Sequence, residues 1–285
     1  MKHLSITEVH SRVLDIAKQF DRICTEHNIP YYMLGGTMLG AIRHKGFIPW
    51  DDDMDFGVPI ECYQNLIGIL EKELPYPFRC CTYKNHPAVL FNYFKIEDQT
   101  TCIDDVAVDL PLDQKLGLNI DVFPLNVCTL GGKAEKRVRS KEDILGKAYL
   151  HSTTQSNSKF RNIVKSALRM ITGGNPEKIQ NDIDKRLQTI KKGDYIGNLL
   201  GRWKDKEIIP KDWYGEGIRY TFEDTSFAKE ISWVTTIMVM PSCASSLMTS
   251  RTSAVSSGSS ADVGSSKYMI SGSVARALAI ATLCC

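Results

Sequence analysis

An acidic segment with apolar neighbours constrains this chain more than any other feature. The sequence Asp-Asp-Asp-Met-Asp begins at Asp51. Five apolar residues flank or interrupt it: Ile48, Trp50, Met54, Phe56 and Val58. A run of charges is usually a solvated turn, but these neighbours favour a strand that is buried on one side. On such a strand Asp51, Asp53 and Asp55 would share one face, with Asp52 on the other. We therefore expect a strand over residues 51–58 with an acidic face.

Carboxylates this close together require a cation. Side chains two positions apart on a strand are separated by roughly 6–7 Å. Carboxylates at this separation raise each other's pKa unless a cation joins them. Oxygen ligands of this kind suit Mg²⁺, Mn²⁺ or Ca²⁺ better than zinc. A calcium loop of the EF-hand type is excluded, because its sixth position is Phe56 instead of glycine and its twelfth is Cys62 instead of glutamate. The segment therefore predicts a Mg²⁺ or Mn²⁺ site at Asp51, Asp53 and Asp55.

A glycine pair lies just upstream of the acidic segment. A short apolar stretch of strand composition leads into Gly35, Gly36 and Thr37, and a helical turn follows. Glycines between a strand and a helix let backbone N–H groups approach phosphate oxygens, and a helix N-terminus favours anions. A glycine pair alone is more often a simple turn, but the carboxylates that follow make these three residues a candidate phosphate loop. Arg43 is suited to a bidentate contact with phosphate.

Hydrophobic periodicity defines the other elements. Apolar residues recur every three or four positions from Val9 to Cys24, after an S-x-x-E capping box at Ser5 and Glu8. Further helices are expected at residues 37–44, 61–74, 133–150 and 177–192, and strands at residues 31–34, 88–96 and 116–123. This order predicts an α+β domain with a mainly helical second half.

The composition excludes several classes of protein. The chain has 35 Lys and Arg and 33 Asp and Glu, which gives a net charge of +2. A general nucleic-acid binder has a larger excess of basic residues. The first eight residues are not a secretory signal, and no stretch reaches the roughly 18 apolar residues of a membrane-spanning helix. The nine cysteines contain no C-x-x-C pair, which indicates reduced thiols. We expect a cytoplasmic protein with no nucleic-acid partner and no transmembrane segment.

The segment 31–55 closely resembles the signature of the LicD family of phosphocholine transferases, which is related to the fukutin-type phosphoribitol transferases. Two further segments are similar to the family pattern, one beginning at Lys95 and the other covering Asn119–Pro124. The resemblance implies a nucleotidyltransferase-like fold, in which a mixed sheet is flanked by helices. It also implies that Asp121 joins the first carboxylates at the metal and that Lys95 contacts donor phosphate.

The resemblance implies a metal-dependent transferase that moves phosphocholine from CDP-choline to a cell-surface glycan. The glycan would be lipopolysaccharide, teichoic acid or capsule, and the enzyme would work in the cytoplasm or at the inner face of the membrane. Other CDP-linked donors, such as CDP-ribitol or CDP-glycerol, are not separated from CDP-choline by the sequence. A catalytically dead glycan- or metal-binding module is a further alternative. The choline-binding residues are not identified, although five aromatic residues are available: Trp50, Phe56, Phe91, Tyr93 and Trp213.

The end of the chain has a different composition. Residues 241–285 contain 13 serines and only four charged residues. Serine-rich tracts of this kind bury too little apolar surface to become ordered. The resemblance also ends near Phe227. We therefore predict a catalytic domain over residues 1–227 and a disordered or non-native tail over residues 228–285, with the reading frame lost near residues 228–230.

Overall fold

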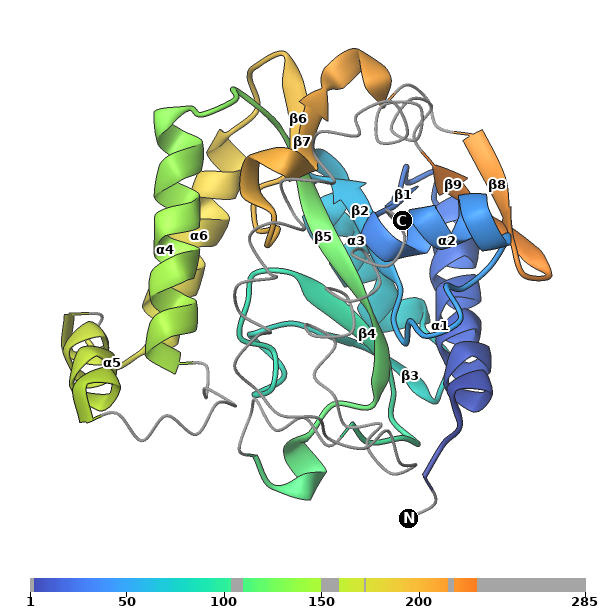
Figure 1. The fold of residues 1–285 in the computed structure, drawn as a ribbon, viewed down its shortest axis with the longest axis horizontal. Helices are drawn as coiled ribbons and strands as arrows, with labels where there is room; N and C mark the ends of the chain where they lie inside the picture. The colour runs from blue at the N-terminus through green and yellow to red at the C-terminus, as the bar shows by residue number, and fades with distance from the viewer. Residues whose placement is uncertain (1–2, 104–109, 150–158, 172, 215–217, 230–285) are drawn as a thin grey trace, which may run out of the picture.

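The computed structural model describes residues 3–103, 110–149, 159–171, 173–214 and 218–229. It shows a mixed sheet of seven strands with helices packed around it, and a separate two-stranded hairpin (Figure 1). The α+β class and the mixed sheet flanked by helices are therefore confirmed. The predicted tail lies outside the described residues from residue 230 onward.

The sheet is built around one long strand. Its principal strands, in spatial order, are β1 (Tyr32–Met33), β2 (Asp55–Pro59), β5 (Leu118–Cys128), β4 (Phe94–Asp98) and β3 (Phe78–Cys81). The β2–β5 pair is parallel and the other pairs are antiparallel. Leu125 of β5 pairs with Pro59 on one edge and with Asn198 on the other. The edge of β5 that carries β4 therefore continues into β6 (Tyr195–Asn198), and β7 (Ile208–Pro210) follows β6.

Two helices cover the apolar face of this sheet. The helix α1 (Ile6–Glu26) begins at the predicted capping box, in which the Ser5 hydroxyl accepts the Glu8 N–H and the Glu8 side chain accepts the Ser5 N–H. Its apolar face packs on β5, as does α3 (Ile60–Glu73). The helix α2 (Gly35–His44) joins β1 to the acidic segment.

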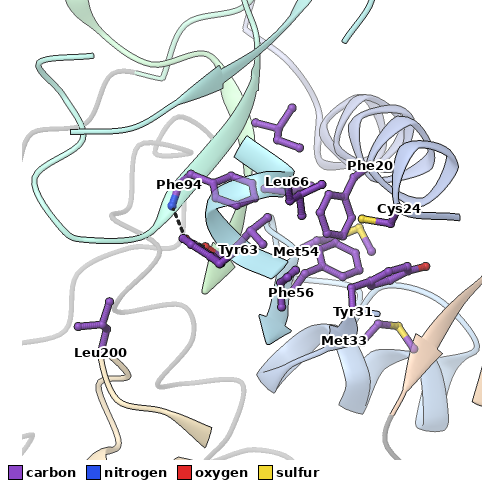
Figure 2. Close-up of a cluster of buried hydrophobic side chains, with 14 of the residues drawn as sticks. Phe20, Cys24, Tyr31, Met33, Met54, Phe56, Tyr63, Leu66, Phe94 and Leu200 are labelled. Atoms are coloured by element: carbon purple, nitrogen blue, oxygen red, sulfur yellow. Dashed lines mark hydrogen bonds between the residues drawn. The ribbon is translucent and has the colours of Figure 1, made fainter. Parts of the chain in front are cut away.

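The core beneath the sheet is rich in aromatic rings. Figure 2 shows Phe20, Tyr31 and Phe56 lying together next to α1, and the ring centroids of Phe20 and Phe56 are 5.1 Å apart. The Tyr63 hydroxyl donates to the Val122 carbonyl at 2.7 Å and accepts the Phe94 N–H at 2.9 Å, the bond dashed in Figure 2. Because Tyr63 is buried, these two bonds tie α3 to β5 and β4 without leaving its hydroxyl unpaired.

Helices follow the long strand. They are α4 (Lys133–Tyr149), α5 (Lys159–Ile171) and α6 (Pro176–Thr189). The helices α4 and α6 correspond to the predicted helices at 133–150 and 177–192, and α5 was not predicted. The side chain of Asn175 caps α6 by accepting the Glu177 N–H at 2.8 Å. In Figure 1, α4 and α6 stand side by side and α5 lies at the outer end of α4, and contacts join α4 to both.

The last described element closes the core near α1. The strands β8 (Ile218–Phe222) and β9 (Thr225–Lys229) form a hairpin that contributes two fully buried phenylalanines, Phe222 and Phe227. Arg219 forms an ion pair with Asp21 of α1. Three short 3₁₀ helices complete the structure: η1 (Leu112–Gln114), η2 (Lys204–Glu207) and η3 (Lys211–Trp213). The described fold thus includes the chain as far as residue 229.

Several predicted boundaries are wrong in an informative way. The strand predicted over 51–58 begins only at Asp55, and the helix predicted at 37–44 already begins at Gly35. The strand predicted at 88–96 begins at Phe94, because the preceding residues form turns. Short strands such as β3 and β6–β9 were not predicted, since three to five residues carry too little periodicity to be recognised.

The Phe56→Ala substitution tests the importance of the aromatic core. Phe56 has no exposed surface and contacts three other rings. We expect the free energy of unfolding, measured by urea denaturation, to fall by about 3–5 kcal/mol. Tyr76→Ala is the control, because Tyr76 is 80% exposed, and its effect should stay within about 0.5 kcal/mol. Equal effects of the two substitutions would contradict the assigned core.

Candidate active site

The site is organised by the register of two parallel strands. Asp55 of β2 and Asp121 of β5 are direct partners in the β2–β5 ladder. Neighbouring strands lie about 4.8 Å apart, so the two carboxylates start from adjacent backbone positions although 66 positions separate them in the sequence. The structure therefore brings together the acidic segment and the aspartate that the resemblance singled out.

Alternation along the strands sets the direction of these side chains. Phe56 and Val122, which follow Asp55 and Asp121, belong to the hydrophobic core beneath the sheet. Since successive side chains of a strand point to opposite faces, the two carboxylates lie on the face away from α1 and α3.

Lys95 stands next to them on the neighbouring strand. Lys95 is the partner of Asp121 in the antiparallel β4–β5 ladder, and its ammonium group forms an ion pair with the Asp121 carboxylate. It also donates to the Asn119 side-chain oxygen at 3.1 Å. Asp55, Asp121 and Lys95 therefore form one row across three strands. The ammonium group offsets part of the negative charge of the row.

Asp51, Asp52 and Asp53 gather by a different geometry from the predicted one. Residues 51–54 form no strand, so the pleat that was expected to turn Asp52 away is missing. One ligand oxygen from each of the three carboxylates lies within 4.8 Å of the other two, and Asp51 is buried. The predicted alternation of side chains is therefore wrong for this stretch. Asp52 joins the acidic cluster, which we define as Asp51, Asp52 and Asp53.

The N-terminus of α2 faces the carboxylates. Gly35 and Gly36 lie in the first turn of this helix and not in a turn before it. A Cβ atom on Gly36 would lie 2.5 Å from the Asp51 Oδ2 atom, and one on Gly35 would lie 3.5 Å from the Asp55 Oδ2 atom. Gly35 also has a φ of +50°, in the left-handed region that favours glycine. Glycine at these positions lets the carboxylates approach the positive end of the helix dipole, which stabilises their charge.

Two further side chains hold the acidic segment in place. The Thr37 hydroxyl accepts the Asp55 N–H at 2.7 Å and thereby fixes the start of β2 against α2. Ring nitrogen Nε2 of His10 donates to the Asp51 carbonyl at 2.6 Å, and the His10 ring stacks on Phe47 with centroids 4.1 Å apart. Sequence reasoning missed His10, because it lies 41 residues from Asp51 on the side of α1. The phosphate role of Thr37 stays a prediction.

Arg43 lies at the opposite end of α2 from the glycines. It occupies the last turn of the helix, which places its backbone about 10 Å along the axis from Gly36. A long guanidinium side chain spans much of that distance, so its proposed contact with phosphate stays a prediction.

Aromatic rings border the row of charges. Tyr93 and Phe123, two positions from Lys95 and Asp121 respectively, have ring centroids 4.4 Å apart. The Lys95 ammonium group lies 5.4 Å from the centroid of the Tyr93 ring, and Phe91 stacks on Tyr93 at 6.2 Å. Phe56, another aromatic residue considered for choline, is fully buried in the core and does not line the site. Sequence reasoning included Tyr93 and Phe91 but missed Phe123.

The donor set fits a hard divalent cation. Its members are carboxylate oxygens, those of the acidic cluster converge within 4.8 Å, and the glycine at position 36 leaves room beside Asp51 that a side chain would fill. Carboxylates are the protein ligands that Mg²⁺ and Mn²⁺ prefer.

A second group of ligand-type side chains has a different character. Cys81, His86 and Glu97 are buried, with ligand atoms within 4.8 Å of one another. Glu97 accepts hydrogen bonds from the Arg79 side chain at 2.8 Å, the Gly117 N–H at 2.8 Å and the Cys81 thiol at 3.3 Å. Burial raises the pKa of Cys81 to about 12 and lowers the pKa of His86, so both are uncharged at neutral pH. We assign this group a structural role, because its polar groups are engaged within the protein.

Comparison with known proteins gives this domain its relatives. Residues 28–128 match the family described as LicD/FKTN/FKRP, nucleotidyltransferase domain. The lipopolysaccharide cholinephosphotransferase LicD of Haemophilus influenzae is 29% identical over 244 residues, which cover 80% of this chain and 86% of that protein. An uncharacterized protein of Rickettsia prowazekii, RP689, is 46% identical over 55 residues, 19% of this chain and 21% of that protein. Human ribitol 5-phosphate transferase FKRP is 48% identical over 33 residues, 12% of this chain and 7% of FKRP.

The Gly36→Ala substitution tests the approach of Asp51 to α2. The added methyl group would overlap Asp51 Oδ2 and displace its carboxylate. We expect the Kd for Mn²⁺, measured by electron paramagnetic resonance, to rise about 10-fold or more. The control is Gly68→Ala in α3, where a Cβ atom meets nothing within 4 Å. This control should leave Mn²⁺ binding unchanged and stabilise the fold by about 0.5–1 kcal/mol. Unaltered Mn²⁺ binding in Gly36→Ala would show that the ion does not depend on the placement of Asp51.

Proposed function

We propose that this chain, whose residues 28–128 match the LicD/FKTN/FKRP nucleotidyltransferase domain, transfers phosphocholine from CDP-choline to a cell-surface glycan. The observation that carries the proposal is the pairing of Asp55 with Asp121 beside the N-terminus of α2. That arrangement places anionic ligands for a cation on one face of the sheet. The N–H groups at the N-terminus of α2, which favour phosphate, lie beside them. The phosphocholine group and the lipopolysaccharide-type acceptor follow the name of the Haemophilus influenzae relative, and the CDP-linked donor follows the family resemblance.

The carboxylates would hold Mg²⁺ or Mn²⁺. Asp51, Asp53, Asp55 and Asp121 were proposed from the sequence, and the geometry adds Asp52 as a ligand or as an acceptor next to the ligands. When bound, such an ion neutralises the pyrophosphate of the donor and stabilises the departing CMP.

The residues around the carboxylates would orient the donor. Backbone N–H groups in the first turn of α2, at Gly35 and Gly36, point toward the side on which the carboxylates lie and favour phosphate oxygens. The Lys95 ammonium group, fixed between Asp121 and the Tyr93 ring, provides a positive charge at the same place. Transfer of a substituted phosphate group depends mainly on such positioning and charge neutralisation.

The acceptor hydroxyl needs a group that takes up its proton. Carboxylates have that capacity, and one that is not fully engaged by the cation would serve as general base. The proton would pass from the glycan hydroxyl to this carboxylate as the hydroxyl oxygen attacks the phosphorus of the phosphocholine group, and the bond to CMP would break.

The aromatic border supports choline as the donor head group. A quaternary ammonium group is attracted to the face of an aromatic ring within about 6 Å. Tyr93 already carries a cation near its ring, the ammonium group of Lys95, and Phe123 extends the aromatic surface beside it. Ribitol would gain nothing from these rings, although the short similarity to the ribitol 5-phosphate transferase FKRP keeps CDP-ribitol as the second candidate donor.

The proposed location is the cytoplasm or the inner face of the membrane. Among the helices of the described residues, none combines the length and the apolar composition required to cross a bilayer.

The first test of the function follows the release of CMP. We expect purified protein to release CMP from CDP-choline when Mg²⁺ or Mn²⁺ and a glycan acceptor are present. Asp53→Asn and Asp121→Asn should each lower kcat/KM by about 100-fold or more, because each removes a charge from the site. Asp15→Asn, which alters an exposed aspartate of α1, is the matched control and should be unchanged. CMP release that persists after removal of divalent cations with EDTA would contradict the proposal.

The second test concerns the head group. In Tyr93→Leu the KM for CDP-choline should rise about 3- to 30-fold, which corresponds to the loss of one cation–π contact. The conservative Tyr93→Phe should retain most of the affinity, because the ring face is kept. The KM for CDP-ribitol, measured with the same variants, should change little. Equal rises for both donors would show that Tyr93 does not contact the head group.

A further inference from the structure

The helix α5 leaves an apolar side exposed. Met170 is 80% exposed, Ile163 64% and Val164 39%. They account for three of the seven large hydrophobic residues that are exposed in the described parts of the chain. Exposed apolar side chains that gather on one element mark an interaction surface more often than isolated ones do.

The packing of α5 explains why this side is free. The helix rests on α4 through a different side: the Arg169 side chain donates to the Ala148 carbonyl at 2.8 Å, and its guanidinium group lies over the Tyr149 ring at 5.6 Å. Figure 1 shows α5 at the periphery, beyond the lower end of α4 and away from the sheet. The apolar side of α5 therefore does not contact the core of the protein.

The exposed residues occupy one stripe of the helix. Ile163, Val164, Ala167 and Met170 are spaced at i, i+1, i+4 and i+7, which places them on one face at 3.6 residues per turn. All four are exposed. We define this stripe as the apolar face of α5.

The charged side chains of α5 and of the sequence on either side of it are all positive. Residues 144–176 contain five Lys and Arg and no Asp or Glu, in a chain whose net charge is only +2. Four of these cations belong to α5, and the fifth lies in the last turn of α4: Lys159, Arg161, Lys165, Arg169 and Lys147. A local block of cations attracts an anionic surface and repels a cationic one.

We propose that α5 docks on the surface of an anionic lipid bilayer, with its apolar face inserted at the boundary between head groups and acyl chains. A helix with an apolar stripe and Lys or Arg as its charged residues has the form of a helix that lies in the membrane interface. The cations of residues 144–176 supply attraction to anionic lipid, and the apolar face supplies burial. The proposal does not depend on the donor or the acceptor of the transfer reaction.

The test is co-sedimentation of the full-length protein with lipid vesicles. We expect binding to vesicles of phosphatidylcholine with phosphatidylglycerol, and at least about tenfold weaker binding to vesicles of phosphatidylcholine alone. Raising the salt concentration should weaken the binding, because salt screens the cations. The double variant Ile163→Gln/Met170→Gln should reduce binding to the anionic vesicles by about tenfold or more, since it removes the two most exposed apolar side chains of the face.

A matched control separates this face from general surface hydrophobicity. Leu130→Gln/Ile218→Gln alters two residues that are 46% and 47% exposed outside α5 and should bind vesicles like the unaltered protein. Circular dichroism should give all variants the same helix content, because every substituted side chain is exposed.

Three results would overturn the proposal. One is no binding of the unaltered protein to anionic vesicles, and another is equal binding by the α5 double variant. The third is a dimer in gel filtration that the α5 double variant converts to a monomer, without any vesicle binding, since the apolar face would then bind a second copy of this chain. None of these results depends on catalytic activity, so they leave the proposed function untouched.

Discussion

The parallel pairing of β2 with β5 is the constraint on which the rest of the site depends. It places Asp55 beside Asp121, and the same ladder directs the residues that follow them, Phe56 and Val122, into the core. Burial of these apolar neighbours fixes the register, because a shift by one residue would expose them and bury the carboxylates. The energy that holds two like charges at adjacent positions therefore comes from the hydrophobic face of the same strands.

The concentration of carboxylates is balanced by several kinds of positive charge. Lys95 pairs with Asp121 on one side, and the positive end of the α2 dipole faces Asp51 and Asp55 on the other. His10 adds a hydrogen bond to the backbone of the acidic segment. A cation and an anionic substrate would complete this balance together, which is why we propose the metal site and the phosphate site on the same face of the sheet.

The supporting structure comes from distant parts of the chain. Tyr63 of α3 joins the two strands that carry Asp121 and Lys95. The hairpin of β8 and β9 adds Phe227 to the rings around Phe56, and the Glu223 side chain accepts the Phe47 N–H at 3.0 Å, beside the loop that leads to the acidic cluster. The last described strand is therefore part of the platform under the site and not an appendage of the domain.

The sequence alone indicated the kind of chemistry to expect, because charged, glycine and apolar residues at fixed spacing restrict what can be bound. It predicted the carboxylates, the glycine pair and the α+β class, and the resemblance added Asp121 and Lys95. Only the tertiary structure decided how they meet. Asp52 does not point away from Asp51 and Asp53 as predicted, because the segment before β2 is held by a turn and by His10 from α1 instead of by a strand partner. Such contacts join residues far apart in the chain, and local periodicity carries no information about them.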